Sequence, residues 1–139
     1  MDAFEQYFLN VIRNHYADFE GRARRKEYWM FYLFTIAIYF AIVILAAILS
    51  SIADVLGLVG WLAYAVFALG VIVPGVAVTV RRLHDTGKSG WLALLGLVPL
   101  LGLVLLYFMV IEGDAGPNEY GPDPKDAYGS DLSSVLDTY

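Results

Sequence analysis

Two long apolar segments, separated by a short polar turn, constrain this chain more than any other feature. Residues 28–49 and residues 55–80 contain no charged side chain. At a rise of about 1.5 Å per residue, roughly 20 residues are enough for a helix to cross a hydrocarbon core about 30 Å thick. Apolar residues also make up 59% of the sequence, whereas soluble globular domains contain roughly 45–50%. The sequence therefore predicts an integral membrane protein in which both segments span.

A third apolar segment, residues 91–111, is compatible with two arrangements. It contains Gly96, Pro99 and Gly102 near its middle. One kinked helix of about 21 residues would cross the membrane, whereas each arm of a re-entrant hairpin would have only about 9 residues. A turn exposed to lipid at that depth would leave backbone groups without hydrogen bonds. We therefore expect a third span, with a hairpin shielded by the other helices as the alternative.

The basic residues indicate how the chain is threaded. One basic block, residues 22–26, precedes the first span and another, residues 81–88, follows the second, while the turn at residues 50–54 has none. Lys and Arg are retained on the cytoplasmic side, so the N-terminus is expected inside. With three spans the acidic tail, residues 112–139, lies outside, which is the expected arrangement; a hairpin would place it inside, next to the basic loop. Residues 125–139 are expected to be a mobile end.

The N-terminal region is expected to form a cytoplasmic amphipathic helix followed by a basic membrane boundary. Phe4, Tyr7, Phe8 and Val11 recur at helical spacing, with polar residues on the other face. Such a helix lies in the headgroup region or packs on the bundle, and the two placements are compatible. The chain as a whole is thus predicted to be an all-α integral membrane helical bundle with three hydrophobic spans. Its expected parts are the N-terminal region 1–27, the bundle 28–111 with spans at about 28–49, 55–80 and 91–111, the cytoplasmic loop 81–90 and the acidic, Gly/Pro-rich tail 112–139.

The loop at residues 81–90 is the densest charged block between apolar segments. Its residues all suit structural tasks: Arg81 and Arg82 complement the carbonyl end of a helix, residues 85–88 favour a tight turn, and Ser89 is a typical N-cap. In the functional interpretation, the two arginines, His84 and Lys88 converge on a phosphate or carboxylate. Asp85 would then orient the imidazole or pair with an arginine. The structural interpretation is the favoured one.

The basic block before the first span is followed directly by Tyr28 and Trp29, as is typical of a cytoplasmic membrane boundary. Its bases also suit anionic lipid headgroups, at about 1 kcal/mol each near the surface. A topological role alone is the favoured interpretation here too. The candidate functional or headgroup-binding residues are Arg22, Arg25, Glu27, Arg81, Arg82, His84, Asp85 and Lys88.

Several function classes are disfavoured by composition. The chain has no cysteine, which excludes disulfides and thiolate catalysis. Its net charge of −5 argues against nucleic-acid binding, which needs a basic surface. The spacing of acids in the tail does not match a calcium-binding EF-hand loop. A His-Asp pair without a nucleophile is weak evidence for catalysis, so the sequence predicts a protein that is not an enzyme and needs no cofactor or metal.

Three motifs resemble the DUF805 family of small bacterial inner-membrane proteins. They are Phe-x-Gly-Arg-x-x-Arg-Lys-Glu-Tyr-Trp at residues 19–29, Arg-Arg-Leu-His-Asp-Thr-Gly-Lys-Ser-Gly-Trp at 81–91, and Gly-x-x-Gly-x-Asn-x-Tyr-Gly-Pro-Asp-Pro at 113–124. The family has no assigned function, so the resemblance implies a multi-pass plasma-membrane protein and no substrate. The positions that match its pattern are Arg22, Arg25, Glu27, Arg81, Arg82, His84, Asp85, Gly87, Ser89, Asn118 and Gly121.

Three functional hypotheses follow. The leading one is a non-enzymatic membrane protein whose basic cytoplasmic surfaces contact anionic lipid headgroups, a protein partner or a second copy of the chain. The second is a small oligomeric transporter or channel subunit, in which Pro74 and the glycines open a path lined by His84 and Asp85. The third is a lipid-headgroup-modifying enzyme that uses His84 as a base with Arg81 and Arg82 on phosphate.

Overall fold

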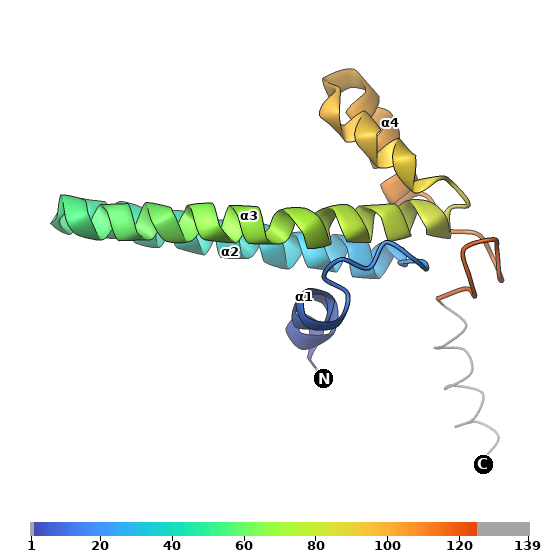
Figure 1. Cartoon of the computed structure of the whole chain (residues 1–139), viewed down its shortest axis with the longest axis horizontal. Coiled ribbons are helices and arrows are strands. Elements are labelled where there is room, and N and C mark those ends of the chain that lie inside the picture. The colour runs from blue at the N-terminus through green and yellow to red at the C-terminus, as the bar shows by residue number, and fades with distance from the viewer. Residues whose placement is uncertain (1, 125–139) are drawn as a thin grey trace, which may run out of the picture. The chain divides into compact units, whose positions relative to one another are not determined.

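The computed structural model describes residues 2–124, and this part of the chain is helical without any strand. The elements, in order, are a π-helical turn η1 (Glu5–Leu9), α1 (Asn10–Asn14), α2 (Arg25–Ile52), α3 (Asp54–Asp85), a 3-10 helix η2 (Gly90–Leu97) and α4 (Pro99–Val110) (Figure 1). The predicted all-α class is confirmed for these residues. The mobile end expected at residues 125–139 lies outside the described part.

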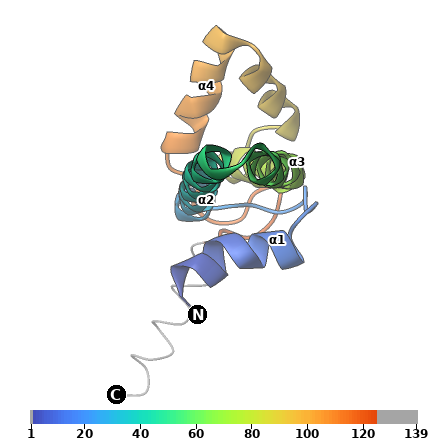
Figure 2. The same cartoon turned by 90° about the vertical axis from the view of Figure 1, so that its left-hand side faces the viewer.

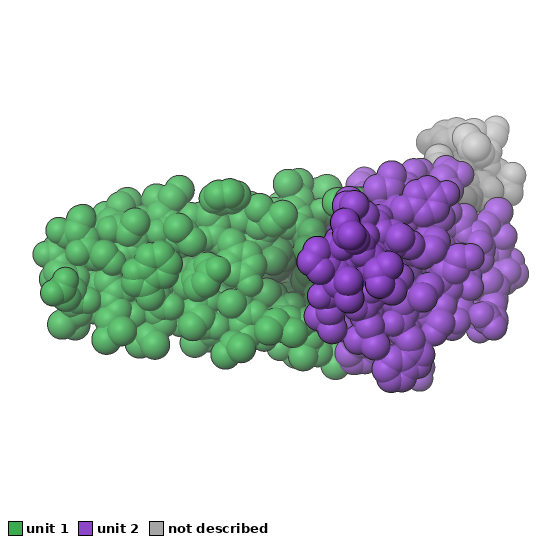
Figure 3. Space-filling view, turned by 90° about the horizontal axis from the view of Figure 1, so that it is seen from above, with its two compact units in different colours: residues 1–17, 29–75 green, residues 18–28, 76–139 purple. Residues whose placement is uncertain are grey.

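The chain forms two compact units (Figure 3). The first combines Met1–Ala17 with Trp29–Gly75, and the second combines Asp18–Tyr28 with Val76–Tyr139. Both long helices contribute to both units, because α2 begins in the second and α3 ends there. The second unit therefore brings together two stretches that are far apart in the sequence.

Helices α2 and α3 are the two elements long and apolar enough to cross a membrane among the described residues. They contain 28 and 32 residues, and the predicted spans at residues 28–49 and 55–80 lie inside them. Within the first unit they run side by side (Figures 1 and 2). Only 11% and 17% of their most apolar windows are buried. Such exposure would be costly in water, but it suits helices surrounded by lipid.

Small residues allow these two helices to approach closely in the first unit. A Cβ atom added to Gly60 would lie 2.8 Å from the Cα of Ala46, and one added to Gly57 would lie 2.9 Å from the Cα of Ser50. Real Cβ atoms do not approach a backbone so closely. Glycine at these two positions is therefore a packing requirement of the kind common between membrane helices.

The substitution Gly60→Ala is expected to destabilise the paired helices by about 1–3 kcal/mol, the usual cost of inserting a methyl group into full packing. Unfolding in mixtures of dodecyl sulfate and a mild detergent, followed by tryptophan fluorescence, measures the change. Gly70→Ala is the matched control, since a Cβ on Gly70 meets nothing within 4 Å. The control should be neutral or slightly stabilising, because alanine favours helix over glycine. Equal effects of the two substitutions would contradict the packing argument.

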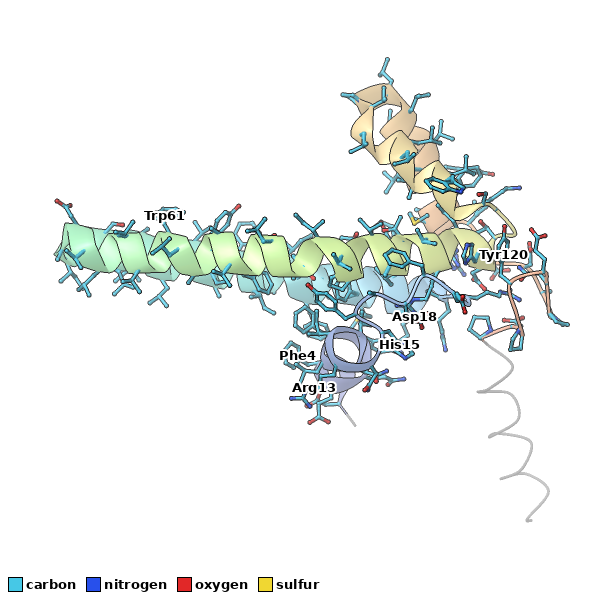
Figure 4. The ribbon with its side chains drawn as sticks, viewed as in Figure 1. Phe4, Arg13, His15, Asp18, Trp61 and Tyr120 are labelled. Atoms are coloured by element: carbon cyan, nitrogen blue, oxygen red, sulfur yellow. The ribbon has the colours of Figure 1, made fainter. Side chains whose placement is uncertain are left out.

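The N-terminal helical region has the apolar face that the sequence predicts. Tyr7, Phe8 and Val11 are buried. The ring of Phe8 stacks on that of Phe31 with centroids 5.6 Å apart, and Phe4 meets Phe34 edge-on at 5.3 Å (Phe4 is labelled in Figure 4). The amphipathic region therefore packs on α2 through aromatic contacts, which is one of the two compatible placements.

The third apolar segment is two helices, not the single helix that the sequence analysis favours. After η2 the chain turns at Val98, which is extended (φ −110°, ψ 121°), and Pro99 begins α4. A residue before proline is pushed out of the helical region by the proline ring, which explains the break. The two elements meet at this turn and diverge from it as a V (Figure 2), with contacts between their residues. With 8 and 12 residues, neither element is long enough to cross a membrane alone, and the break between them is compatible with the alternative of a hairpin. Whether the segment spans stays a prediction.

Candidate functional site

The charged block at the end of α3 is helical and not a loop. Arg81, Arg82, His84 and Asp85 all lie in the last turns of α3, so only residues 86–89 connect it to η2. The helix ends where Gly87, at φ +73°, adopts the left-handed conformation that favours glycine. The predicted N-cap is confirmed, because the Ser89 side chain accepts a hydrogen bond from the backbone N–H of Trp91 at 3.3 Å.

Asp85 lies between two arginines in the interior of the second unit. Arg22 Nη2 lies 2.9 Å from Asp85 Oδ1, and Arg82 Nη1 lies 2.5 Å from Oδ2. The three side chains are at most 2% exposed. Charges removed from water this completely are tolerated only when they are paired and hydrogen-bonded. Asp85 was expected either to orient the imidazole of His84 or to pair with an arginine, and in the structure it pairs with two arginines.

The same arginines bind backbone carbonyls at the end of α4 and in the tail. Arg22 Nη2 donates to the carbonyl of Asp114 at 2.6 Å, and Nη1 donates to that of Gly116 at 2.7 Å. Arg82 donates to the carbonyl of Ile111. The backbone N–H of Asp114 also donates to the carbonyl of Asp85 at 2.6 Å. We call Arg22, Arg82 and Asp85 the buried triad; it joins the segment before α2, the end of α3 and the tail.

Arg81 and Glu27 form a second ion pair beside the triad. Arg81 Nη1 lies 2.5 Å from Glu27 Oε1, and the arginine side chain is 5% exposed. Its remaining nitrogens Nε and Nη2 are buried without a hydrogen-bond partner among the described residues. Glu27 thus neutralises Arg81 inside the protein.

Two of the predicted candidates lie at the surface. Arg25 donates to the carbonyl of Val110 at 3.1 Å and pairs with the exposed carboxylate of Glu112 at 3.2 Å. Lys88 is exposed, with its ammonium group 5.9 Å from the centroid of the Phe108 ring. The structure therefore divides the predicted basic residues into a buried set, Arg22, Arg81 and Arg82, and an exposed or half-exposed set.

His84 is held by the segment before α2 and by the tail. Its Nδ1 lies 2.9 Å from the carbonyl oxygen of Gly21. The ring of Tyr120 stacks on the imidazole with centroids 3.9 Å apart and an interplanar angle of 2° (Tyr120 is labelled in Figure 4). Because a carbonyl only accepts, Nδ1 carries the proton, and Nε2 is the acceptor in the neutral imidazole. The carboxylate of Asp85 bonds the arginines and does not orient this ring.

A short turn in the tail holds Tyr120 in place. Asn118 and Gly121 exchange two backbone hydrogen bonds, and the Asn118 side chain donates to the carbonyl of His84 at 2.9 Å. Tyr120 is a site residue that sequence reasoning missed. The only signal for it is its position in the Asn-x-Tyr-Gly-Pro motif, since nothing in local sequence links the tail to α3.

The described residues contain no cluster of three His, Asp or Glu side chains that could hold a metal ion. What the arrangement provides chemically is a buried triad of two arginines and one aspartate, whose guanidinium groups also bind backbone carbonyls, and one imidazole nitrogen free to accept a hydrogen bond.

Comparison with known proteins finds a family and several relatives. The family model described as "Protein of unknown function (DUF805)" matches residues 16–122. Inner membrane protein YhaI of Escherichia coli K12 is 46% identical over 121 residues, covering 86% of this chain and 96% of the relative. Inner membrane protein YhaH of the same strain is 40% identical over 127 residues, with the same coverage. No solved structure matches the chain.

Proposed function

Since the chain belongs to the DUF805 family of proteins of unknown function, we propose that it is a non-enzymatic, multi-pass protein of the bacterial plasma membrane that contacts anionic lipid headgroups. The observation that carries the membrane assignment is the exposure of α2 and α3, whose apolar windows are 11% and 17% buried. Two long helices of this kind need lipid around them. The relatives named as inner membrane proteins support the same assignment.

The proposed threading has two spans, α2 and α3, and a helical hairpin, η2 with α4, that enters and leaves the membrane on one side. Its support is the contact between Arg22 and the tail carbonyls of Asp114 and Gly116. Groups in direct contact lie on the same side of a membrane. We place both on the cytoplasmic side, because basic residues gather there. This replaces the expectation of a tail outside, which requires a single span over residues 91–111.

Headgroup contact is assigned to the exposed lysines and not to the buried arginines. Arg22 and Arg82 share the buried carboxylate of Asp85 and bind backbone carbonyls, and Arg81 pairs with Glu27. Lys26 and Lys88 are exposed, one in the first turn of α2 and one between α3 and η2. The ammonium group of Lys88 lies 5.9 Å from the centroid of the Phe108 ring, a weak cation–π contact that leaves the exposed charge available to headgroups.

Neutralising both lysines in the variant Lys26→Gln/Lys88→Gln is expected to weaken retention of phosphatidylglycerol. At about 1 kcal/mol for each lysine, the affinity should fall roughly 10- to 30-fold. Native mass spectrometry of protein released from mixed phosphatidylglycerol and phosphatidylcholine nanodiscs measures the retained lipid. The variant Lys26→Arg/Lys88→Arg keeps the charge and should retain phosphatidylglycerol as the wild type does. Unchanged retention in the glutamine variant would remove headgroup contact from the proposal and leave the membrane assignment.

A further inference from the structure

The second unit contains a cavity of about 470 Å³ beside His84. One wall is a stripe of α3, on which Val76, Val80 and His84 recur every four residues and so share a face. The opposite wall is the first part of η2, from Gly90 to Leu94. The volume is within the range of about 300–1,000 Å³ that is typical of small-molecule sites.

The lining of the cavity combines polar and apolar residues. His84, Ser89 and Tyr120 supply polar groups, and the remaining lining residues are apolar or glycine. On the lipid side, Trp91 is 80% exposed and Leu94 is 56% exposed. Tryptophan favours the boundary between lipid and water. The cavity therefore combines exposed apolar residues of η2 with a few polar groups, which suits an amphiphile.

One of these polar groups presents a hydrogen-bond acceptor. His84 is 9% exposed, and its Nδ1 already donates to the carbonyl of Gly21. Nε2 is not among the buried unpartnered atoms of the described residues, so it is accessible from the cavity. A Cβ on Gly90 would lie 3.3 Å from Nε2 and 2.6 Å from Cγ1 of Val80, so the glycine keeps the space beside the imidazole open.

The lining has no charged residue. Arg22 and Arg82 do not line the cavity either, and both bind the carboxylate of Asp85. An anionic group in this cavity would lose its hydration without gaining a paired cation, which is costly. A hydroxyl group, by contrast, donates to an imidazole acceptor and carries no charge.

We propose that this cavity binds a neutral glycerolipid, with an acyl chain between α3 and η2 and a glycerol hydroxyl donating to His84 Nε2. The stacked ring of Tyr120 holds the imidazole plane in the orientation that this bond needs. This site goes beyond the proposed headgroup contact, because it uses neither Lys26 nor Lys88.

The test uses monooleoylglycerol as the probe and the full chain in phosphatidylcholine nanodiscs. The sequence has two histidines, so His15→Gln leaves His84 as the only ¹⁵N-histidine signal. Titration with monooleoylglycerol is expected to move the Nε2 resonance in a saturable way. The same lipid with both hydroxyls methylated should leave it in place, since it has no donor. An equal response to both lipids would overturn the hydrogen bond to His84.

Occupancy is measured independently with a photoreactive diazirine monoacylglycerol, mapped by mass spectrometry. Crosslinks are expected on residues 76–80 and 90–94, and Leu94→Trp, which fills the cavity, should reduce them about tenfold. Leu100→Trp is the matched control, because Leu100 is 79% exposed and does not line the cavity. His84→Phe keeps the ring and removes the acceptor, so affinity should fall roughly two- to tenfold, the worth of one hydrogen bond.

Two results would overturn the site. The first is that Leu94→Trp and Leu100→Trp reduce the crosslinking equally. The second is that oleate competes better than monooleoylglycerol, which would indicate an anionic ligand. The variant Lys26→Gln/Lys88→Gln should bind monooleoylglycerol as the wild type does. Failure of the cavity and failure of the headgroup contact are thus distinguished by separate variants and separate lipids.

Discussion

Replacing Asp85 with alanine is expected to destabilise the protein by about 3–5 kcal/mol, the usual cost of leaving a buried charge without its partner. Two guanidinium groups, those of Arg22 and Arg82, would lose their carboxylate while remaining out of contact with water. Reversible unfolding in mixed detergent micelles, followed by tryptophan fluorescence, measures the change in the free energy of unfolding. Most of the effect should persist in high salt, because a buried pair is screened little.

Glu112→Ala is the matched control for this prediction. It also removes a carboxylate from an arginine, but the side chains of Arg25 and Glu112 are 42% and 73% exposed. Exposed pairs contribute about 1 kcal/mol or less. A loss for Asp85→Ala no larger than that for Glu112→Ala would show that the triad does not hold the second unit together.

The second large effect is expected in the accessibility of single cysteines from the two sides of the membrane. The chain has no cysteine of its own, so Ser51→Cys, Ser89→Cys and Glu119→Cys each carry one thiol at an exposed position. Helix α3 has 32 residues and is about 48 Å long at 1.5 Å per residue, so its ends lie on opposite sides. An impermeant maleimide should label Ser51→Cys from outside only, and the other two from inside only.

This labelling distinguishes the two arrangements of residues 91–111 by an all-or-none result. A single span would place Glu119→Cys outside together with Ser51→Cys, and the contacts of Arg22 with the tail would then be broken in the membrane. Labelling of Glu119→Cys from the same side as Ser89→Cys supports the hairpin. Labelling within permeabilised cells gives the total of reactive thiol and controls for buried sites.

The two long helices could be predicted because their signal is local. Uninterrupted apolar residues over the length of a bilayer, as in 28–49 and 55–80, leave little choice of structure. The Ser89 cap and the turn at Gly87 are equally local, since each depends on a few neighbouring residues. Pro99 also favours a break at Val98, because the residue before a proline avoids the helical region. The length of the apolar segment, however, favours one continuous span.

The arrangement of the site could not be predicted, because its partners lie far apart in the chain. Arg22 and Asp85 are separated by 63 positions, and Arg22 and Gly116 by 94. Nothing local shows that an arginine before the first span faces an aspartate after the second. The resemblance to a family marked Arg22, Asp85 and Asn118 as matching positions, but it did not show that they meet. The sequence therefore predicts a basic surface, whereas Arg22, Arg81 and Arg82 are buried in the structure.

The joining of three distant segments has a consequence for biosynthesis. A chain emerges from the ribosome with its N-terminal part first. Early segments cannot complete their contacts until the later segments have been synthesised. Arg22 emerges long before the carbonyls of Asp114 and Gly116 that it binds, so α2 and α3 are available for insertion while the second unit is still incomplete. Closure of that unit is a late event. A chain truncated just after residue 111 would retain both long helices, but Arg22 would lack the carbonyls of Asp114 and Gly116.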